Sequence, residues 1–355
     1  MKRALTILLQ RAVLPGLLGL LGLLGCLAGS GALAQAPLKE IRIAVPDLST
    51  GNTPSGGGVV DVLRAQQILE REFAADGIAI QWRFFKGAGP VVNEALANGQ
   101  VDFAYLGDLA AIIGKANGLD TRLLSATARD IRLYLGVVPG STVKTLADLE
   151  GKRVAIFRGT AYQLSFAQAL ASQGLRERDL QVVNLDGNAA SAALAARQID
   201  ATWGGANLIS LQQRGLAHLP LSTDDLGGAG SVQAMLVGTG AFVDAHPEVV
   251  ERLLRAQQQA VRWLRDSANQ QAYVALLADL SGYPRTLLQR DLEHSDVRRM
   301  FDPRLDADYL ARLQAGVDLA VQQRLVRKGF AVAEWAAPGF LEAALRSAPG
   351  VTAQR

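Results

Sequence analysis

The sequence predicts an α/β protein built from two similar lobes, and three observations support this fold class. Residues 94–108, EALANGQVDFAYLGD, return in looser form at residues 192–206 as AALAARQIDATWGGA. Strand-like apolar runs alternate with helical patterns along most of the chain, and 355 residues are enough for about two domains. Two further apolar runs lie where the chain would pass between the lobes. We therefore expect one lobe per copy of the repeat.

Each copy of the repeat predicts the end of a helix, a turn, a short strand and a glycine turn at the carboxyl end of that strand. Ligands bind at the carboxyl ends of strands in open α/β sheets. The pattern is also common in helix-turn-strand units that bind nothing. If these strand ends do bind a ligand, the residues expected to face it are Gly107, Asp108, Trp203 and Gly205.

The amino-terminal segment predicts an export signal over residues 1–34. Lys2, Arg3 and Arg11 precede a run rich in Leu and Gly, and small residues allow cleavage after Ala34. The run falls short of the ~20 apolar residues that a membrane span prefers. The segment LLGC at 23–26 is similar to a bacterial lipoprotein box, so a lipid anchor on Cys26 is the alternative. Either outcome leaves the folded part outside the cytoplasm.

Charge and cysteine content exclude several classes of function. The whole chain has a formal net charge of +3, and residues 1–34 hold three basic and no acidic residues, so the remainder is neutral overall. We therefore expect no nucleic-acid partner. Cys26 is the only cysteine, which excludes a disulfide or a thiolate nucleophile in the mature domain. The three widely separated histidines favour neither a metal site nor a cofactor.

In chain order, the first lobe begins with a strand at 39–46 and a loop at 47–58 rich in Ser, Thr and Gly, which can lie against a ligand. A helical pattern covers 59–69, and Pro90 suits the first turn of another helix. Asp108 can cap the helix that follows the strand of the first repeat. The remaining strands are expected at 78–85, 101–106, 123–127 and, as the first crossing, 133–139.

The second lobe contains the best candidate for an anion site. A short helix at 146–149 and a strand at 153–157 precede Gly159, Thr160, Ala161 and Tyr162, which open a helix at 164–171. Thr160 and Gln163 have capping-box spacing. A helix that starts directly after a strand directs free N–H groups and the positive end of its dipole into the crevice. Further strands are expected at 180–184, 199–203, 218–221 and, as the second crossing, 232–238.

The two crossings predict a hinge and a discontinuous first lobe. Lobe I then comprises residues 38–131 plus 239–347, and lobe II comprises residues 132–238. Pro247 marks the start of a long helix. Further helices, at about 268–280, 284–293, 306–326 and 337–346, are expected to pack on lobe I.

Several segments together resemble the bacterial periplasmic solute-binding proteins for aliphatic sulfonates, taurine and nitrate. They are KGAGPVVNEALANGQVDFAYLGD, TLADLEGKRVAIFRGTAYQLSFAQAL, LAARQIDATWGGANL and AFVDAHPEVVERLL, and the resemblance spans about residues 40–280. It implies a type II periplasmic-binding-protein fold, a ligand held between the lobes and a membrane permease of an ATP-binding-cassette (ABC) importer as partner. Relatives usually have an Asp-Pro pair where this chain has Gly205-Ala206-Asn207, and the 47–58 loop is longer here. Both departures leave the exact ligand open.

A sulfonate is anionic at any biological pH, so its recognition needs amides, hydroxyls or an arginine. Candidates for these donors are Ser49, Thr50, Arg129, Thr160 and Tyr162. Asp108 would repel a bare anion, so it either pairs with the ammonium of a zwitterion such as taurine or only caps its helix. Trp203 either lines the organic tail of the ligand or belongs to the core.

These observations predict a monomeric periplasmic binding protein for a small organosulfur anion, with no catalytic residue, cofactor or metal. The alternative cargoes are nitrate and a thiamine-pyrimidine precursor. A few relatives cleave sulfur from aromatic sulfinates with a Cys nucleophile. The mature chain has no Cys for that chemistry, so an enzymatic role is disfavoured.

Overall fold

The structure, a computed structural model, describes residues 37–347. The expected export signal, its cleavage after Ala34 and the lipid anchor on Cys26 lie outside these residues and stay predictions. None of the helices in the described part combines the length and the apolar character needed to cross a membrane.

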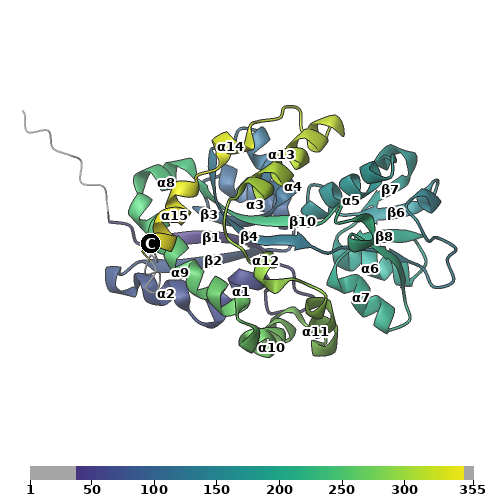
Figure 1. Cartoon of the computed structure of the whole chain (residues 1–355), viewed down its shortest axis with the longest axis horizontal. Coiled ribbons are helices and arrows are strands. Elements are labelled where there is room, and N and C mark those ends of the chain that lie inside the picture. Colours follow the sequence, from purple (N-terminus) through teal and green to yellow (C-terminus); the bar gives the residue numbers. More distant parts are fainter. Residues whose placement is uncertain (1–36, 348–355) are drawn as a thin grey trace, which may run out of the picture. The chain divides into compact units, whose positions relative to one another are not determined.

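The strands form two sheets of five (Figure 1). The first has the order β2 (Ala79–Phe85), β1 (Glu40–Pro46), β3 (Phe103–Gly107), β10 (Val232–Thr239) and β4 (Thr121–Ile131). The second has the order β7 (Gln181–Asn184), β6 (Arg153–Ile156), β8 (Ala201–Gly204), β5 (Tyr134–Val137) and β9 (His218–Ser222). Two sheets with helices confirm the predicted α/β fold of two lobes.

Helices precede or follow most strands. Within the first lobe they are α1 (Gly58–Ala65), α2 (Ile68–Phe73), α3 (Ala88–Ala97) and α4 (Asp108–Ala116). The second lobe has α5 (Ala161–Ser172), α6 (Gly187–Ala195) and α7 (Ala206–Gln213). After β10 come α8 (Gly240–Ala245), α9 (Pro247–Arg265), α10 (Gln270–Ser281), α11 (Arg285–Glu293), α12 (Val297–Met300), α13 (Ala307–Gln322), α14 (Val332–Trp335) and α15 (Pro338–Arg346).

Two helix predictions differ from the structure. The helix expected over 59–69 is divided because Gln67 adopts a left-handed backbone, with φ of 48°, between α1 and α2. The break lets Leu69 of α2 bury in the same core as Leu63 of α1. The helix expected at 146–149 is a single 3₁₀ turn, Ala147–Leu149. By contrast, Pro247 begins α9 as predicted, since a first-turn residue needs no N–H bond.

The two sheets have the same topology. In each, three parallel strands are followed by one strand that runs antiparallel to both of its neighbours, namely β10 in the first sheet and β5 in the second. Both antiparallel strands enter directly after the chain has crossed from the other sheet. The expected extent of lobe II, 132–238, differs from this pairing, because β10 hydrogen-bonds to β3 and β4 of the first sheet. The crossings are therefore the segments 132–133 and 223–231.

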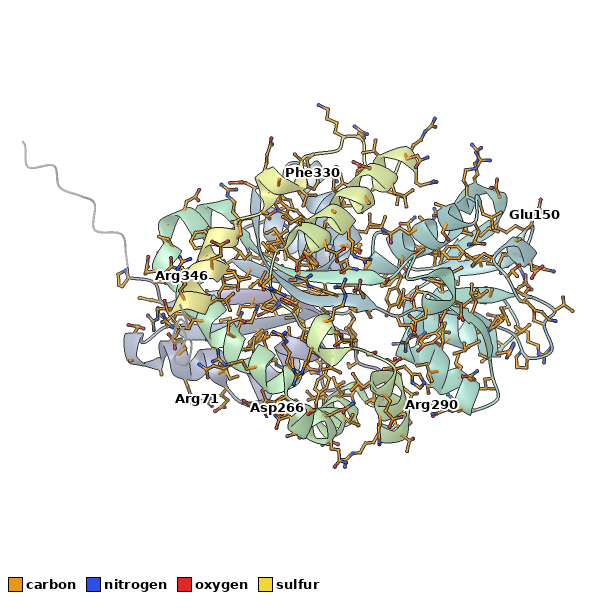
Figure 2. All side chains as sticks on the ribbon, viewed as in Figure 1. Arg71, Glu150, Asp266, Arg290, Phe330 and Arg346 are labelled. Carbon is orange, nitrogen blue, oxygen red and sulfur yellow. The ribbon has the colours of Figure 1, made fainter. Side chains whose placement is uncertain are left out.

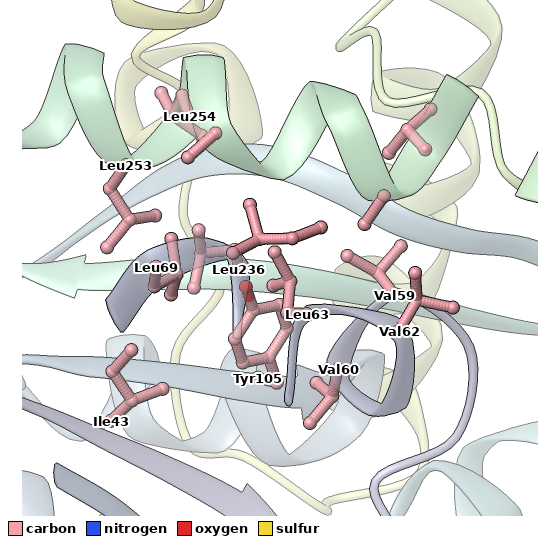
Figure 3. Close-up of a cluster of buried hydrophobic side chains, with 14 of the residues drawn as sticks. Ile43, Val59, Val60, Val62, Leu63, Leu69, Tyr105, Leu236, Leu253 and Leu254 are labelled. Atoms are coloured by element: carbon pink, nitrogen blue, oxygen red, sulfur yellow. The ribbon is translucent and has the colours of Figure 1, made fainter. Parts of the chain in front are cut away.

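The first sheet has an apolar core on each face. On one face, α1, α2 and α9 bury Val59, Leu63, Leu69, Leu253 and Leu254 against Ile43 and Leu236 of the strands (Figure 3). On the other face, α3, α4, α13 and α14 enclose Leu106, Ile112, Tyr309 and Trp335. Burial of a large apolar side chain contributes about 1.5–3 kcal/mol. The first sheet is therefore the buried centre of the first lobe, between two layers of helices.

The second sheet is also covered on both faces. Phe166 of α5 packs against Trp203 of β8 on one face, and Leu194 of α6 joins Leu208 of α7 on the other. Charged side chains such as Arg71, Glu150 and Arg346 extend outward at the periphery (Figure 2). In both lobes, an apolar core therefore holds the strands whose ends lead into the loops.

Candidate functional site

The strand end of the first repeat touches the start of α5 in the second lobe. A β-carbon built on Gly107 would lie 2.6 Å from Cβ of Ala161, closer than real side chains approach. Gly107 is also the N-cap of α4, so the first turns of α4 and α5 meet here. Only a glycine allows the two lobes to come this close at this point.

Two other glycines complete the junction. Gly159 has φ of 74°, which favours glycine, and a β-carbon there would lie 3.0 Å from Cγ of Pro90 in α3. A β-carbon on Gly205 would lie 3.3 Å from the Tyr162 hydroxyl. The structure therefore brings Gly107, Gly159, Ala161, Tyr162 and Gly205 together, although the sequence separates them by up to 98 residues.

The amino terminus of α5 offers backbone N–H donors that no described acceptor uses. The predicted capping box does not form, because the Thr160 hydroxyl donates to the carbonyl of Phe157 at 2.7 Å and Gln163 Oε1 accepts from Gly159 N at 2.9 Å. Among the described residues, no acceptor bonds to the backbone N–H of Ala161 or Tyr162. Free N–H groups and the helix dipole together favour an anion.

Two tyrosines from different lobes border this junction. Tyr162 belongs to α5, and Tyr283 lies in the turn between α10 and α11. Burial and the nearby carboxylate of Asp291 raise the pKa of the Tyr162 hydroxyl, while burial and the neighbouring Tyr162 raise the pKa of Tyr283. Both hydroxyls therefore stay protonated as hydrogen-bond donors.

Tyr283 and Asp291 were missed by the sequence reasoning, which treated the carboxyl-terminal helices only as packing. The Asp291 carboxylate accepts a hydrogen bond from Tyr134 of β5 at 2.8 Å and lies 3.8 Å from Arg132. Burial raises the pKa of Asp291, and the Tyr134 hydrogen bond and Arg132 oppose that shift. A tyrosine between Gly282 and Pro284, in a turn between two helices, was the available signal for Tyr283.

The 47–58 loop lies beside the segment that carries Tyr283. Thr50 donates to the carbonyl of Ser281 through its backbone N–H at 3.0 Å and through its hydroxyl at 2.9 Å. The Thr50 hydroxyl therefore already donates its proton to Ser281 and has none left to donate to a ligand. The buried Ser49 hydroxyl has only a long bond, 3.4 Å, to the carbonyl of Gly51, and its ligand role stays a prediction.

Arg129 is not at the junction. It is 2% exposed, and its guanidinium bonds to Asp306 at 2.9 Å and donates to the carbonyls of Asp302 and Arg304. Its guanidinium also lies 4.8 Å from the ring centroid of Tyr309. Arg129 was expected in the ligand site because no local pattern indicates its partners, which lie about 175 residues later in the chain.

Trp203 and Asp108 also point away from the junction. Trp203 is 2% exposed, and its indole N–H donates to Ser165 at 2.8 Å, so the core interpretation of this residue holds. Asp108 is the first residue of α4 rather than its N-cap. Its carboxylate accepts from Leu109 N at 2.7 Å and from Gln233 N of β10 at 3.1 Å. The Asp108 carboxylate therefore does not face an anion bound at the start of α5.

This arrangement suits the non-covalent binding of a small anion. The amides of α5 and two tyrosine hydroxyls supply donors, and the donors come from both lobes. Two α/β lobes joined by two crossings, with such donors where they meet, define a two-lobed solute-binding protein of the periplasmic-binding-protein fold.

Comparison with known proteins agrees with this class. The chain belongs to the NMT1/THI5-like family, whose family model matches residues 73–270. A protein from Escherichia coli (strain K12) named for binding aliphatic sulfonates is 28% identical over 279 residues, which cover 75% of this chain and 81% of that protein.

Two solved structures have the same fold. A periplasmic sulfonate-binding protein from Methylobacillus flagellatus KT superposes with a TM-score of 0.75 at 26% identity, covering 87% of this chain and 94% of that one. The alkanesulfonate-binding protein from Xanthomonas axonopodis pv. citri, bound to MOPS, has a TM-score of 0.71 at 25% identity, with 85% and 99% covered.

Proposed function

We propose that this protein is the extracytoplasmic solute-binding component of an ABC importer and that it binds a small organosulfonate between its lobes. The observation that carries the proposal is the start of α5, where unused backbone N–H groups lie against the Gly107 turn of the other lobe. The relatives named for sulfonates support the cargo class.

A sulfonate fits these donors chemically. It has three acceptor oxygens and keeps its charge at any biological pH, so its recognition needs no titrating base. The N–H groups of Ala161 and Tyr162 would hold one oxygen, and the hydroxyls of Tyr162 and Tyr283 would hold the others. Because Tyr162 and Tyr283 come from different lobes, the bound ligand would hold the two lobes together.

The location and partners follow from the same proposal. The protein would act as a monomer in the periplasm, reached through the export signal at 1–34 or held by a lipid on Cys26. It would deliver its cargo to a membrane permease. It would release the ligand unchanged, because the chain outside residues 1–34 offers no Cys nucleophile.

Calorimetric titration of the purified protein tests the cargo. The panel is ethanesulfonate, butanesulfonate, taurine, MOPS, nitrate and an aminopyrimidine. At 100 times its dissociation constant, a true ligand also stabilises the protein by about 2.7 kcal/mol. Binding of nitrate or the pyrimidine without any sulfonate would replace the proposed cargo, and a failure of the whole panel would reject the proposal. Mass spectrometry after incubation checks that the ligand is unchanged.

Two variants test the site. Tyr162→Phe and Tyr283→Phe each remove one donor and should weaken binding of the best sulfonate about tenfold. Tyr105→Phe is the matched control, because the Tyr105 hydroxyl donates to Gln257 in the core at 2.8 Å. It should lower stability and leave the affinity unchanged. Unaltered affinity in both Tyr162→Phe and Tyr283→Phe would place the ligand elsewhere.

A further inference from the structure

The first crossing between the lobes begins at an irregular point of the first sheet. Between two of its pairings with β10, β4 has one residue more than its partner, so Arg129 and Asp130 stand opposite Gln233 alone. Such a β-bulge bends the strand. Asp130 has φ of 53°, a left-handed backbone that residues other than glycine seldom adopt. Because the crossing 132–133 follows at once, the conformation of Asp130 sets the direction in which the chain enters lobe II.

The side chain of Asp130 joins the two crossings to lobe I. Its carboxylate accepts from Nε2 of Gln233 at 3.2 Å, and Gln233 lies two residues after the second crossing, 223–231. Arg299 of α12 donates to the same carboxylate at 2.8 Å, and Arg312 of α13 lies 3.6 Å from it. The start of the first crossing and the end of the second are therefore bonded through one carboxylate to two helices of lobe I.

Arg132 joins the crossings to each other. Its guanidinium donates to Asp224 of the second crossing at 2.5 Å and to the carbonyl of His294, at the end of α11, at 2.6 Å. The backbones pair as well, since the N–H of Thr223 donates to the carbonyl of Leu133 at 2.9 Å. The two crossings are therefore bonded side by side, and both are bonded to the helices that follow β10.

We propose that Asp130 is a positioning residue, whose carboxylate, held by Gln233 and two arginines, fixes the angle between the lobes. A left-handed residue with a side chain persists only where its surroundings hold it. Without the charge, the two arginines would no longer hold the bulge, and lobe II would sample other angles. Asp130 would act on a ligand only through the lobes, because its side-chain partners lie outside the junction at the start of α5.

The chain offers a matched control for the charge. Asp308 of α13 accepts from Arg299 at 2.8 Å and from Arg312 at 3.2 Å, so it pairs with the same two arginines. Its side-chain bonds within residues 37–347 go to these arginines alone, and all three residues belong to lobe I. Asp130→Asn and Asp308→Asn each remove one carboxylate from the cluster. Asparagine tolerates a left-handed backbone and keeps an acceptor for Gln233, so Asp130→Asn tests the charge itself.

The distance between two spin labels measures the angle between the lobes. Cys26 is the only cysteine of the chain, so the protein without residues 1–34 accepts labels at Arg71→Cys and Glu150→Cys alone. Both side chains are exposed, Arg71 on α2 of lobe I and Glu150 on lobe II (Figure 2). In the absence of ligand, Asp130→Asn should widen the distance distribution about twofold, and Asp308→Asn should retain the wild-type distribution. A wild-type distribution in Asp130→Asn would overturn the proposal.

Ligand titration tests the consequence for binding, which rests on the proposed function. Asp130→Asn should weaken the best sulfonate about fivefold, because fewer molecules hold the two halves of the site together, and Asp308→Asn should keep the wild-type affinity. Saturating sulfonate should narrow the distribution of Asp130→Asn again. A widened distribution with wild-type affinity would refute the positioning role. If the wild-type protein binds no sulfonate, the proposed cargo fails, and the distances measured without ligand still decide whether Asp130 fixes the lobes.

Discussion

The two copies of the repeat use one structural device in different surroundings. In the first, Asp102 accepts from the backbone N–H of Arg42 at 2.7 Å and pairs with its guanidinium at 2.6 Å. In the second, Asp200 makes the same two bonds to Arg153, at 2.8 and 3.3 Å. The carboxylate is 8% exposed in the first copy and 35% exposed in the second. The repeated Asp therefore ties a turn to β1 in the first sheet and to β6 in the second, and it is not a ligand group.

In both copies of the repeat, the aromatic residue belongs to the buried scaffold and the glycine lies at the candidate site. Tyr105 and Trp203 both bury their rings and bond their polar tips to a neighbouring helix. Gly107 and Gly205 instead both approach the first turn of α5. At the candidate ligand site, the two copies therefore share a glycine whose backbone lies close to α5. What they do not share is Asp108, whose counterpart in the second copy is Ala206.

The largest effect should come from this unshared acid. The pKa of Asp108 in the folded protein, about 7, lies above its ordinary value of 3.8. Its contribution to stability is therefore complete below about pH 4 and is lost as the pH rises through 7. Asp108→Asn should flatten this fall, by up to about 4 kcal/mol, in urea unfolding at pH 4 to 8. The exposed Asp244→Asn is the control and should retain the wild-type slope.

The two strand-end glycines should differ in their effect on ligand affinity. Gly107→Ala places a methyl 2.6 Å from Cβ of Ala161 and should hold the lobes apart, at a cost of about 2 kcal/mol in sulfonate binding. Gly205→Ala meets only the hydroxyl end of Tyr162 at 3.3 Å and should cost less than about 1 kcal/mol. Calorimetry measures both, and equal losses would contradict the junction described above.

The duplicated ion pair should show the effect of burial. Asp102→Ala removes a carboxylate that is only 8% exposed and takes the acceptor from both the backbone N–H and the guanidinium of Arg42, so it should lower the free energy of unfolding by about 2 kcal/mol. Asp200→Ala breaks a pair that water can replace and should cost about 1 kcal/mol or less. Chemical denaturation of the two variants gives the difference, and a larger loss for Asp200→Ala would reverse the comparison.

The smallest effect should come from the turn before each Asp. Gly99 has φ of 62°, and its counterpart Arg197 adopts φ of 58°, a left-handed conformation that costs a side-chain residue about 1 kcal/mol. Arg197→Gly should therefore raise the thermal midpoint slightly, and Gly99→Ala should lower it. A stabilising Gly99→Ala would show that this turn relaxes without strain.

Much of the fold was predictable because its signals are local. Alternating residues in EIRIAVP, the proline at the start of α9 and the repeated Asp each act through neighbours within a few residues or through one strand pairing. The turn from Gly159 to Tyr162 was predictable for the same reason, since a helix that follows a strand exposes its own amides. The failed capping box at Thr160 shows the limit, because the hydroxyl found a nearer acceptor in Phe157.

The sequence by itself determined two α/β halves, their order along the chain and a helix start suited to an anion, because periodicity and turn chemistry depend on short stretches of chain. Only the tertiary structure placed Tyr283 near Tyr162, enclosed Arg129 with Asp306 and turned Asp108 toward Gln233. The physical reason is that side-chain partners are set by packing between segments more than 100 residues apart, and no local pattern records which of them meet.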